Sequence, residues 1–143
     1  MPDRLRIALD MLDGCQELEC DGMTRIISGL LQEAEIGHYV VVGGIEDTRT
    51  GKFFRPHMWI DLEDGRRIDY RARMWFKNDL LAPHGVFRPE ENRYFFYSGN
   101  RHDPVPGDAK VGRILSQHMD GVPYEEVLEL LRTIKVTIEG DAS

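Results

Sequence analysis

Residues 57–72 alternate apolar and polar side chains on either side of a turn at Glu63, Asp64 and Gly65. Because successive side chains on a strand point to opposite faces, the length of the loop decides which residues share a face. A two-residue turn at Asp64-Gly65 would mix apolar and charged residues. A three-residue loop with Gly65 in the left-handed conformation instead predicts one apolar face. That face would hold Met58, Ile60, Leu62, Ile68, Tyr70 and Ala72.

The other face of this predicted hairpin is polar, and it would hold His57, Trp59, Asp61, Arg67, Asp69 and Arg71. In this register Asp69 lies across from Trp59 and diagonal to His57. Diagonal neighbours are about 7–8 Å apart at the backbone, within reach of an imidazole and a carboxylate. The apolar pattern therefore predicts a His57-Asp69 pair without any assumption about function.

A second strong pattern begins at Cys20, where apolar residues recur at the spacing of one helical face and Gly37 provides a stop. This stripe consists of Met23, Ile26, Ile27, Leu30, Leu31 and Ala34. Further helices are predicted from Asp3 to Leu12, after Asp108 and near Pro123, and strands over 38–45 and 92–99. The segment 134–140 could add an edge strand. The order of elements predicts one α+β domain over residues 1–143.

Composition excludes several classes of function. The formal net charge of −7 argues against nucleic-acid binding, which needs a net basic face. No run approaches the roughly 20 apolar residues of a membrane span, and the first twelve residues lack the apolar core of a secretory signal. Two cysteines only five residues apart fit free thiols in a reducing cytoplasm. We therefore expect a cytoplasmic protein with no membrane partner and no cofactor.

Cys20 is the candidate nucleophile. It lies at a predicted helix start, where unpaired backbone N–H groups favour a thiolate, and three residues before the inward-facing Met23. A histidine held by a carboxylate is what a thiol nucleophile requires, because an imidazolium nearby lowers the thiol pKa. The flanking Glu19 and Asp21 would oppose a thiolate unless they face solvent. Cys15, in the preceding connection, has no comparable placement.

The ordered set of a cysteine at a helix start, the strand motif His57-Met-Trp59 and Asp69 on the next strand resembles the transglutaminase-like branch of papain-fold cysteine enzymes. The match covers about residues 15–75. A similar His-to-Asp spacing occurs in small peptidases that remove leaders from lasso-peptide precursors. The resemblance implies a papain-like core, with N-terminal helices packed on an antiparallel sheet and helices at the C-terminus. It also implies acyl transfer at amide bonds of a peptide or protein substrate through a thioester.

The expected roles follow from this chemistry. Cys20 would attack the carbonyl, His57 would act as base and then acid, and Asp69 would orient His57. The backbone N–H of Cys20 could bind the oxyanion, with Gln16 as a further donor. Trp59 would form a wall beside the thiol. Arg71 belongs to a cluster with Arg66, Arg67, Arg73 and Lys77 that could recognise an acidic peptide or could simply face solvent.

Two other interpretations stay open. The same residues could pack a non-enzymatic interaction domain or an inactive relative, since free cysteine is often a core residue. A zinc site from both cysteines, His57 and Asp69 is disfavoured by the atypical C-x4-C spacing, so we expect no metal.

Overall fold

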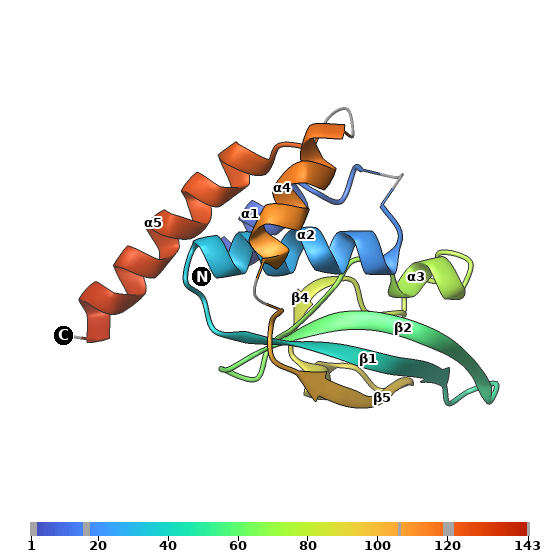
Figure 1. Ribbon diagram of the computed structural model, residues 1–143. Helices are drawn as coiled ribbons and strands as arrows, with labels where there is room; N and C mark the ends of the chain where they lie inside the picture. Colours follow the sequence, from blue (N-terminus) through green and yellow to red (C-terminus); the bar gives the residue numbers. More distant parts are fainter. Residues whose placement is uncertain (1–2, 16–17, 106, 119–121, 143) are drawn as a thin grey trace.

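The computed structural model of the chain describes residues 3–15, 18–105, 107–118 and 122–142. These residues form five strands and five α-helices in a mixed α+β arrangement, as predicted, with two helices before the strands and two after them (Figure 1). In order they are α1 (Arg4–Asp10), α2 (Cys20–Glu33), β1 (His38–Asp47), β2 (Lys52–Leu62), β3 (Arg67–Asp69), α3 (Ala72–Trp75), β4 (Gly85–Phe87), the 3-10 helix η1 (Pro89–Glu91), β5 (Phe95–His102), α4 (Asp108–His118) and α5 (Tyr124–Ala142).

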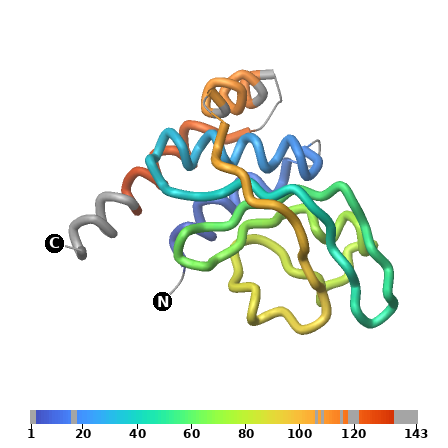
Figure 2. The backbone as a smooth tube through the Cα atoms, turned by 60° about the horizontal axis from the view of Figure 1, so that its bottom comes forward, coloured from blue at the N-terminus to red at the C-terminus, as the bar shows by residue number. Residues whose placement is uncertain are grey.

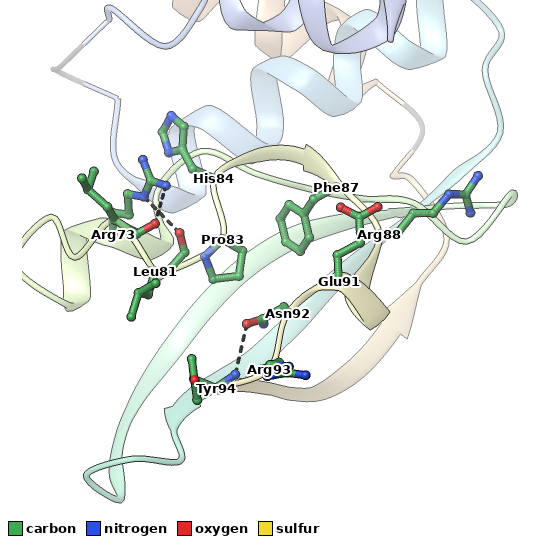
Figure 3. Close-up of a pocket in the computed structure, with 12 residues that line it drawn as sticks. Arg73, Leu81, Pro83, His84, Phe87, Arg88, Glu91, Asn92, Arg93 and Tyr94 are labelled. Carbon is green, nitrogen blue, oxygen red and sulfur yellow. Dashed lines mark hydrogen bonds between the residues drawn. The ribbon is translucent and has the colours of Figure 1, made fainter. Parts of the chain in front are cut away.

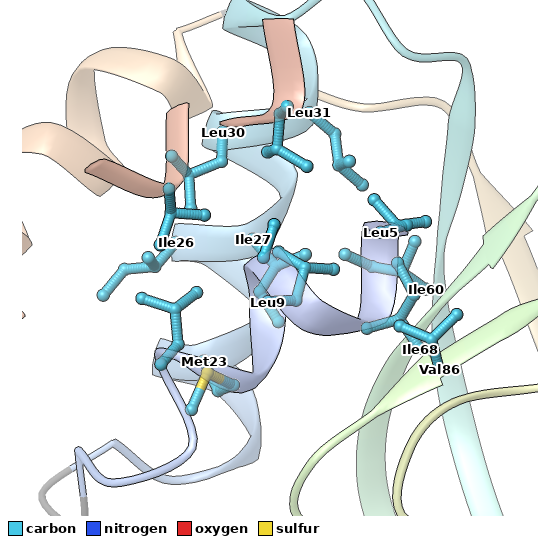
Figure 4. Close-up of a cluster of buried hydrophobic side chains, with 14 of the residues drawn as sticks. Leu5, Leu9, Met23, Ile26, Ile27, Leu30, Leu31, Ile60, Ile68 and Val86 are labelled. Atoms are coloured by element: carbon cyan, nitrogen blue, oxygen red, sulfur yellow. The ribbon is translucent and has the colours of Figure 1, made fainter. Parts of the chain in front are cut away.

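The strands form one antiparallel sheet in the order β4-β3-β2-β1-β5. The larger helices gather on one side of this sheet, with α2 lying along it (Figure 1). The predicted stripe of α2 is buried there against α1, α5 and the apolar face of the β2-β3 hairpin (Figure 4). The N-terminal helices therefore pack on the antiparallel sheet, and the C-terminal helices α4 and α5 pack on the N-terminal ones. No helix among the described residues is long and apolar enough to cross a membrane.

The hairpin has the register that the alternation predicts. Ile60 pairs with Ile68, Asp61 pairs with Arg67, and the backbone N–H of Leu62 donates to the carbonyl of Arg66 across the three-residue loop. Gly65 has a φ of 94°, in the left-handed region that a residue with a Cβ rarely adopts. The prediction of an odd-length loop is confirmed, and it places His57, Trp59 and Asp69 on one face of the sheet.

The hairpin is nevertheless shorter than predicted. β3 ends at Asp69, and the chain turns at Arg71 into the short helix α3, so Arg71 and Ala72 do not continue the strand. The predicted edge strand over 134–140 is wrong, because α5 continues through it. Tyr124, Val127, Leu128 and Leu131 are buried at helical spacing. Because this buried stripe starts a helix, the helix continues through the later β-branched residues that had suggested a strand.

The polar face of the hairpin is buried, contrary to its composition. The backbone of the sheet is strongly curled (Figure 2). As a result the rings of Phe87 on β4 and Tyr97 on β5, at its two edges, lie 6.2 Å apart. The guanidinium of Arg67 lies 4.8 Å from the Tyr97 ring and pairs with Asp61 at 2.7 Å. Polar groups that the sequence alone would place toward water are thus held inside the concave side of the sheet.

Candidate functional site

The site begins at the amino end of α2, where Cys20 is the first helical residue. The cap residue Glu19 has an extended backbone, and within the described residues its side chain makes no capping hydrogen bond. The backbone N–H of Gly22 donates to the Asp21 carboxylate at 2.8 Å, so the N–H groups of Cys20 and Asp21 are the ones left to an anion. Glu19 and Asp21 are both exposed, so water screens the two charges that would oppose a thiolate. Cys20 itself is partly buried and unbridged.

His57 and Asp69 form the pair that the register predicted. The ring Nε2 of His57 lies 2.7 Å from Asp69 Oδ2, and the exposed fractions of the two side chains are 0% and 1%. The hydroxyl of Tyr97 donates to the same carboxylate oxygen at 2.9 Å, and the backbone N–H of Arg71 donates to Oδ1 at 2.9 Å. Both oxygens of the buried carboxylate are thus satisfied, which fixes its orientation toward the imidazole.

The electrostatics of His57 follow from these neighbours. Burial disfavours the charged imidazolium, but the negative charge of Asp69, its hydrogen bond and a smaller contribution from the Cys20 thiol outweigh burial and raise the pKa of His57 to about 9. Cys20 and Asp69 line the same small cavity, so the thiol lies beside the His57-Asp69 pair. Because Asp69 occupies Nε2, the nitrogen left to exchange a proton with the thiol is Nδ1.

A second group already contacts that nitrogen. The indole Nε1–H of Trp75 on α3 donates to His57 Nδ1 at 2.9 Å. An indole N–H can only donate, so this bond exists only with the neutral ring and opposes the protonation of His57 that Asp69 favours. The Trp75 ring is held by stacking on Phe54, with centroids 5.3 Å apart. Protonation of Nδ1 by the thiol therefore requires the indole to give up its hydrogen bond.

The shortness of β3 explains how a helix on the apolar face reaches a histidine on the opposite face. Beyond Trp59, β2 has no neighbour on the β3 side, because β3 pairs only with residues near Ile60. Cys20, Met58, Asp69 and Tyr70 line one small cavity of about 10 Å³ around this opening. The helix start thus meets the concave face at the end of the strand. It does so while α2 packs mainly along β2.

The structure does not place the residues expected to touch substrate in one common cleft. Trp59 is 1% exposed and stacks on His57 with centroids 5.8 Å apart, so it packs behind the imidazole rather than beside an open cleft. Arg71 contacts the segment before Cys20, where it pairs with Asp13 at 3.1 Å and donates to the carbonyls of Cys15 and Leu18. Through these contacts Arg71 stabilises the segment before Cys20. Gln16 lies outside the described residues.

Two contacting residues were missed from the sequence, Trp75 and Tyr97. Tyr97 lies two residues after the buried Phe95, so the alternation along β5 could have placed both on the inner face. Trp75 lies in a four-residue helix, which is too short to show a periodic pattern. Only the tertiary fold brings its indole to His57.

Comparison with protein-family models, curated proteins and solved structures gives no match for this chain. Within the described residues, no three histidine, cysteine or acidic side chains come together as potential metal ligands. The chemistry of the site must therefore be argued from its own geometry.

Proposed function

We propose that the protein is a cysteine-dependent acyl-transfer enzyme of transglutaminase-like type that acts on amide bonds of peptides or proteins. The observation that carries the proposal is that Cys20 and Asp69 line one small cavity, while the Asp69 carboxylate holds His57 at 2.7 Å. A thiol at a helix start therefore lies beside an imidazole that is oriented by a buried carboxylate. This arrangement supplies a nucleophile, a base and an orienting group.

The reaction would proceed in two balanced halves. Nδ1 of His57 takes the thiol proton while the Cys20 sulfur forms a bond to the amide carbonyl carbon, and free N–H groups at the start of α2 stabilise the oxyanion. Collapse of this intermediate breaks the C–N bond, and Nδ1 returns the proton to the leaving amine. Water or a second amine then attacks the thioester with the same proton transfers, which releases the acyl group and restores the thiol. Trp75 has to leave Nδ1 before the first step.

The closed state of the site favours one alternative, a non-enzymatic interaction domain. His57 is fully buried, its two nitrogens both have partners, and the cavity at Cys20 is close to the smallest that holds one water molecule. A hydrogen-bond network that only stabilises the fold would have the same geometry as an enzyme site in its resting state. Reactivity therefore has to separate the two functions.

Site-resolved alkylation at about pH 6 provides this test, because an ordinary thiol with a pKa near 8.5 is almost unreactive there. We expect iodoacetamide to label Cys20 faster than Cys15, which is the internal control in the same chain. His57→Gln is the matched variant, because its amide can still donate to Asp69 and accept from Trp75 but cannot take a proton. It should slow labelling of Cys20 alone. Equal slow labelling of both thiols, unchanged in His57→Gln, would favour the interaction domain.

A further inference from the structure

Two hollows adjoin on the surface beside the candidate site. The larger, of about 860 Å³, is bordered by Leu18 and Glu19, which directly precede Cys20. The smaller, of about 310 Å³, extends from there to Tyr94 (Figure 3). Both are lined by Arg73, Leu80 and His84, so they are adjacent, and we call the two together the groove. Each has a volume within or near the roughly 300–1,000 Å³ typical of small-molecule sites, and side by side they suit several residues of a peptide.

The groove exposes apolar side chains that the rest of the protein does not cover. Leu80 is 80% exposed, more than any other large apolar side chain in the described part of the chain. Further exposed apolar residues of the lining are Met74, Leu81 and Tyr94. Single exposed apolar residues are ordinary, but several along one groove are typical of an interaction site.

The charge of the groove is opposite to that of the molecule. Its lining includes four cations that form no salt bridge with a described carboxylate: Arg73, Lys77, Arg88 and Arg93. The guanidinium of Arg73 donates to the carbonyls of Leu80 and Ala82, which are neutral, so its charge is not cancelled. Only Glu19 and Glu91 are unpaired acids in the same lining. This net positive surface belongs to a chain with a formal charge of −7.

We infer that this groove binds an extended peptide segment in which apolar residues are flanked by acidic ones, and that it is the substrate-recognition surface of the thiol site. The inference rests on the proposed function. The apolar side chains of the peptide cover Leu80 and its neighbours, while its carboxylates meet cations that form no salt bridge of their own. The segment then runs toward Leu18 and Glu19, which brings an amide of the peptide to Cys20.

Binding should be measured with the Cys20→Ser protein, so that the result does not depend on turnover. The probes are fluorescein-labelled peptides with a Leu-Phe centre flanked by Asp and Glu, by Lys, or by Ser. The acidic peptide should bind at least about tenfold more tightly than the lysine peptide, and added salt should reduce the difference. An acidic peptide with a Ser-Ser centre should also bind more weakly, because it cannot cover the apolar lining.

Paired variants locate the binding. Lys77→Glu combined with Arg93→Glu should weaken the acidic peptide at least about tenfold, since two attractive contacts become repulsive. Arg132→Glu, an exposed and unpaired position on α5, is the matched control and should leave binding unchanged. Equal binding of acidic and lysine peptides, absence of binding, or an equal loss in Arg132→Glu would overturn the inference. So would self-association of the protein that closes the groove.

The two proposals fail in different ways. If an activated ester acylates Cys20 but no acidic peptide binds, the groove is not the recognition surface and the thiol chemistry stands. If the acidic peptide binds but Cys20 remains unreactive, the groove serves a docking domain and the enzyme proposal fails. In the parent protein, the acidic peptide should slow alkylation of Cys20 and leave Cys15 unaffected.

Discussion

At the scale of single residues, the ring of His57 connects every part of the candidate site. One nitrogen is held by Asp69, and the other is contacted by an indole at rest and is needed by a thiol during the proposed reaction. The pairing of His57 with Asp69 could be predicted from the sequence, because strand parity alone puts them on one face. The indole of Trp75 could not, because a contact 18 residues apart through a short helix leaves no local pattern.

The first prediction concerns Trp75→Phe. Phenylalanine preserves an aromatic ring against Phe54 but removes the N–H that occupies Nδ1 of His57. Without this donor, protonation of Nδ1 no longer costs a hydrogen bond, so a thiolate beside an imidazolium is favoured and Cys20 should be alkylated faster at about pH 6 than in the parent protein. Mass spectrometry of the labelled peptide gives the rate, with Cys15 as the reference. An unchanged or lower rate at Cys20 would show that the indole does not compete with the thiol.

The second prediction uses the raised pKa of His57. A group whose pKa is higher in the folded than in the unfolded chain stabilises the fold fully below its unfolded value, and this stabilisation is lost as the pH rises through the folded value. For His57 these values are 6.5 and about 9, so its contribution should be lost mainly between them. The full effect is on the order of 3 kcal/mol.

Asp69→Asn is the variant that checks this. It removes the charge that raises the pKa of His57, so the fall in unfolding free energy between pH 6.5 and 9 should be smaller than in the parent. Urea titrations in the presence of a reductant measure both proteins. A parent and variant with parallel pH profiles would contradict the role of the Asp69 charge.

At the scale of elements, β5 closes the concave side of the sheet and carries Tyr97 to Asp69. Its close approach to β1 depends on two glycines that face each other, Gly43 and Gly99. A Cβ added at Gly43 would overlap the backbone oxygen of Ser98, and one at Gly99 would lie 2.6 Å from the carbonyl oxygen of Val42. Backbone atoms on both sides leave no flexible side chain that could move away.

The third prediction is therefore that Gly43→Ala destabilises the protein by about 2 kcal/mol or more, because the strands have to separate. It should also slow alkylation of Cys20, since a displaced β5 no longer holds Asp69 through Tyr97. Gly14→Ala is the control, as its added Cβ would meet nothing within 4 Å. Urea unfolding gives the stabilities. A Gly43→Ala protein as stable as Gly14→Ala would contradict the close packing of β1 on β5.

The elements themselves differ in how far the sequence predicts them. The α2 stripe and the β2-β3 alternation are long enough to show their periods, and both are present with their predicted faces. The three-residue β4 and the four-residue α3 are too short for their period to repeat, so they leave no recognisable pattern. α5 shows the opposite case, in which buried residues early in a helix decide the conformation of a later β-prone segment.

At the scale of the whole molecule, the sheet has two buried faces of different kinds. The helix-covered face is apolar and holds most of the core, while the concave face encloses His57, Asp61 and Asp69. Composition alone predicted that this second face is polar, but it could not predict its burial, which depends on contacts between the two edges of the sheet. Burying this many ionisable groups is costly unless each has a partner, and sites of this kind are often functional.

The measurement that tests the account most directly is acylation by a p-nitrophenyl ester, which requires no knowledge of the natural substrate. We predict a burst of nitrophenol and an acyl group on Cys20 that hydroxylamine removes, as expected of a thioester. The burst should be absent in Cys20→Ser and strongly reduced in His57→Gln, with both variants folded by circular dichroism. Acylation of Cys15 and Cys20 at equal slow rates, unchanged in His57→Gln, would contradict the proposal that these residues form a thiol acyl-transfer site.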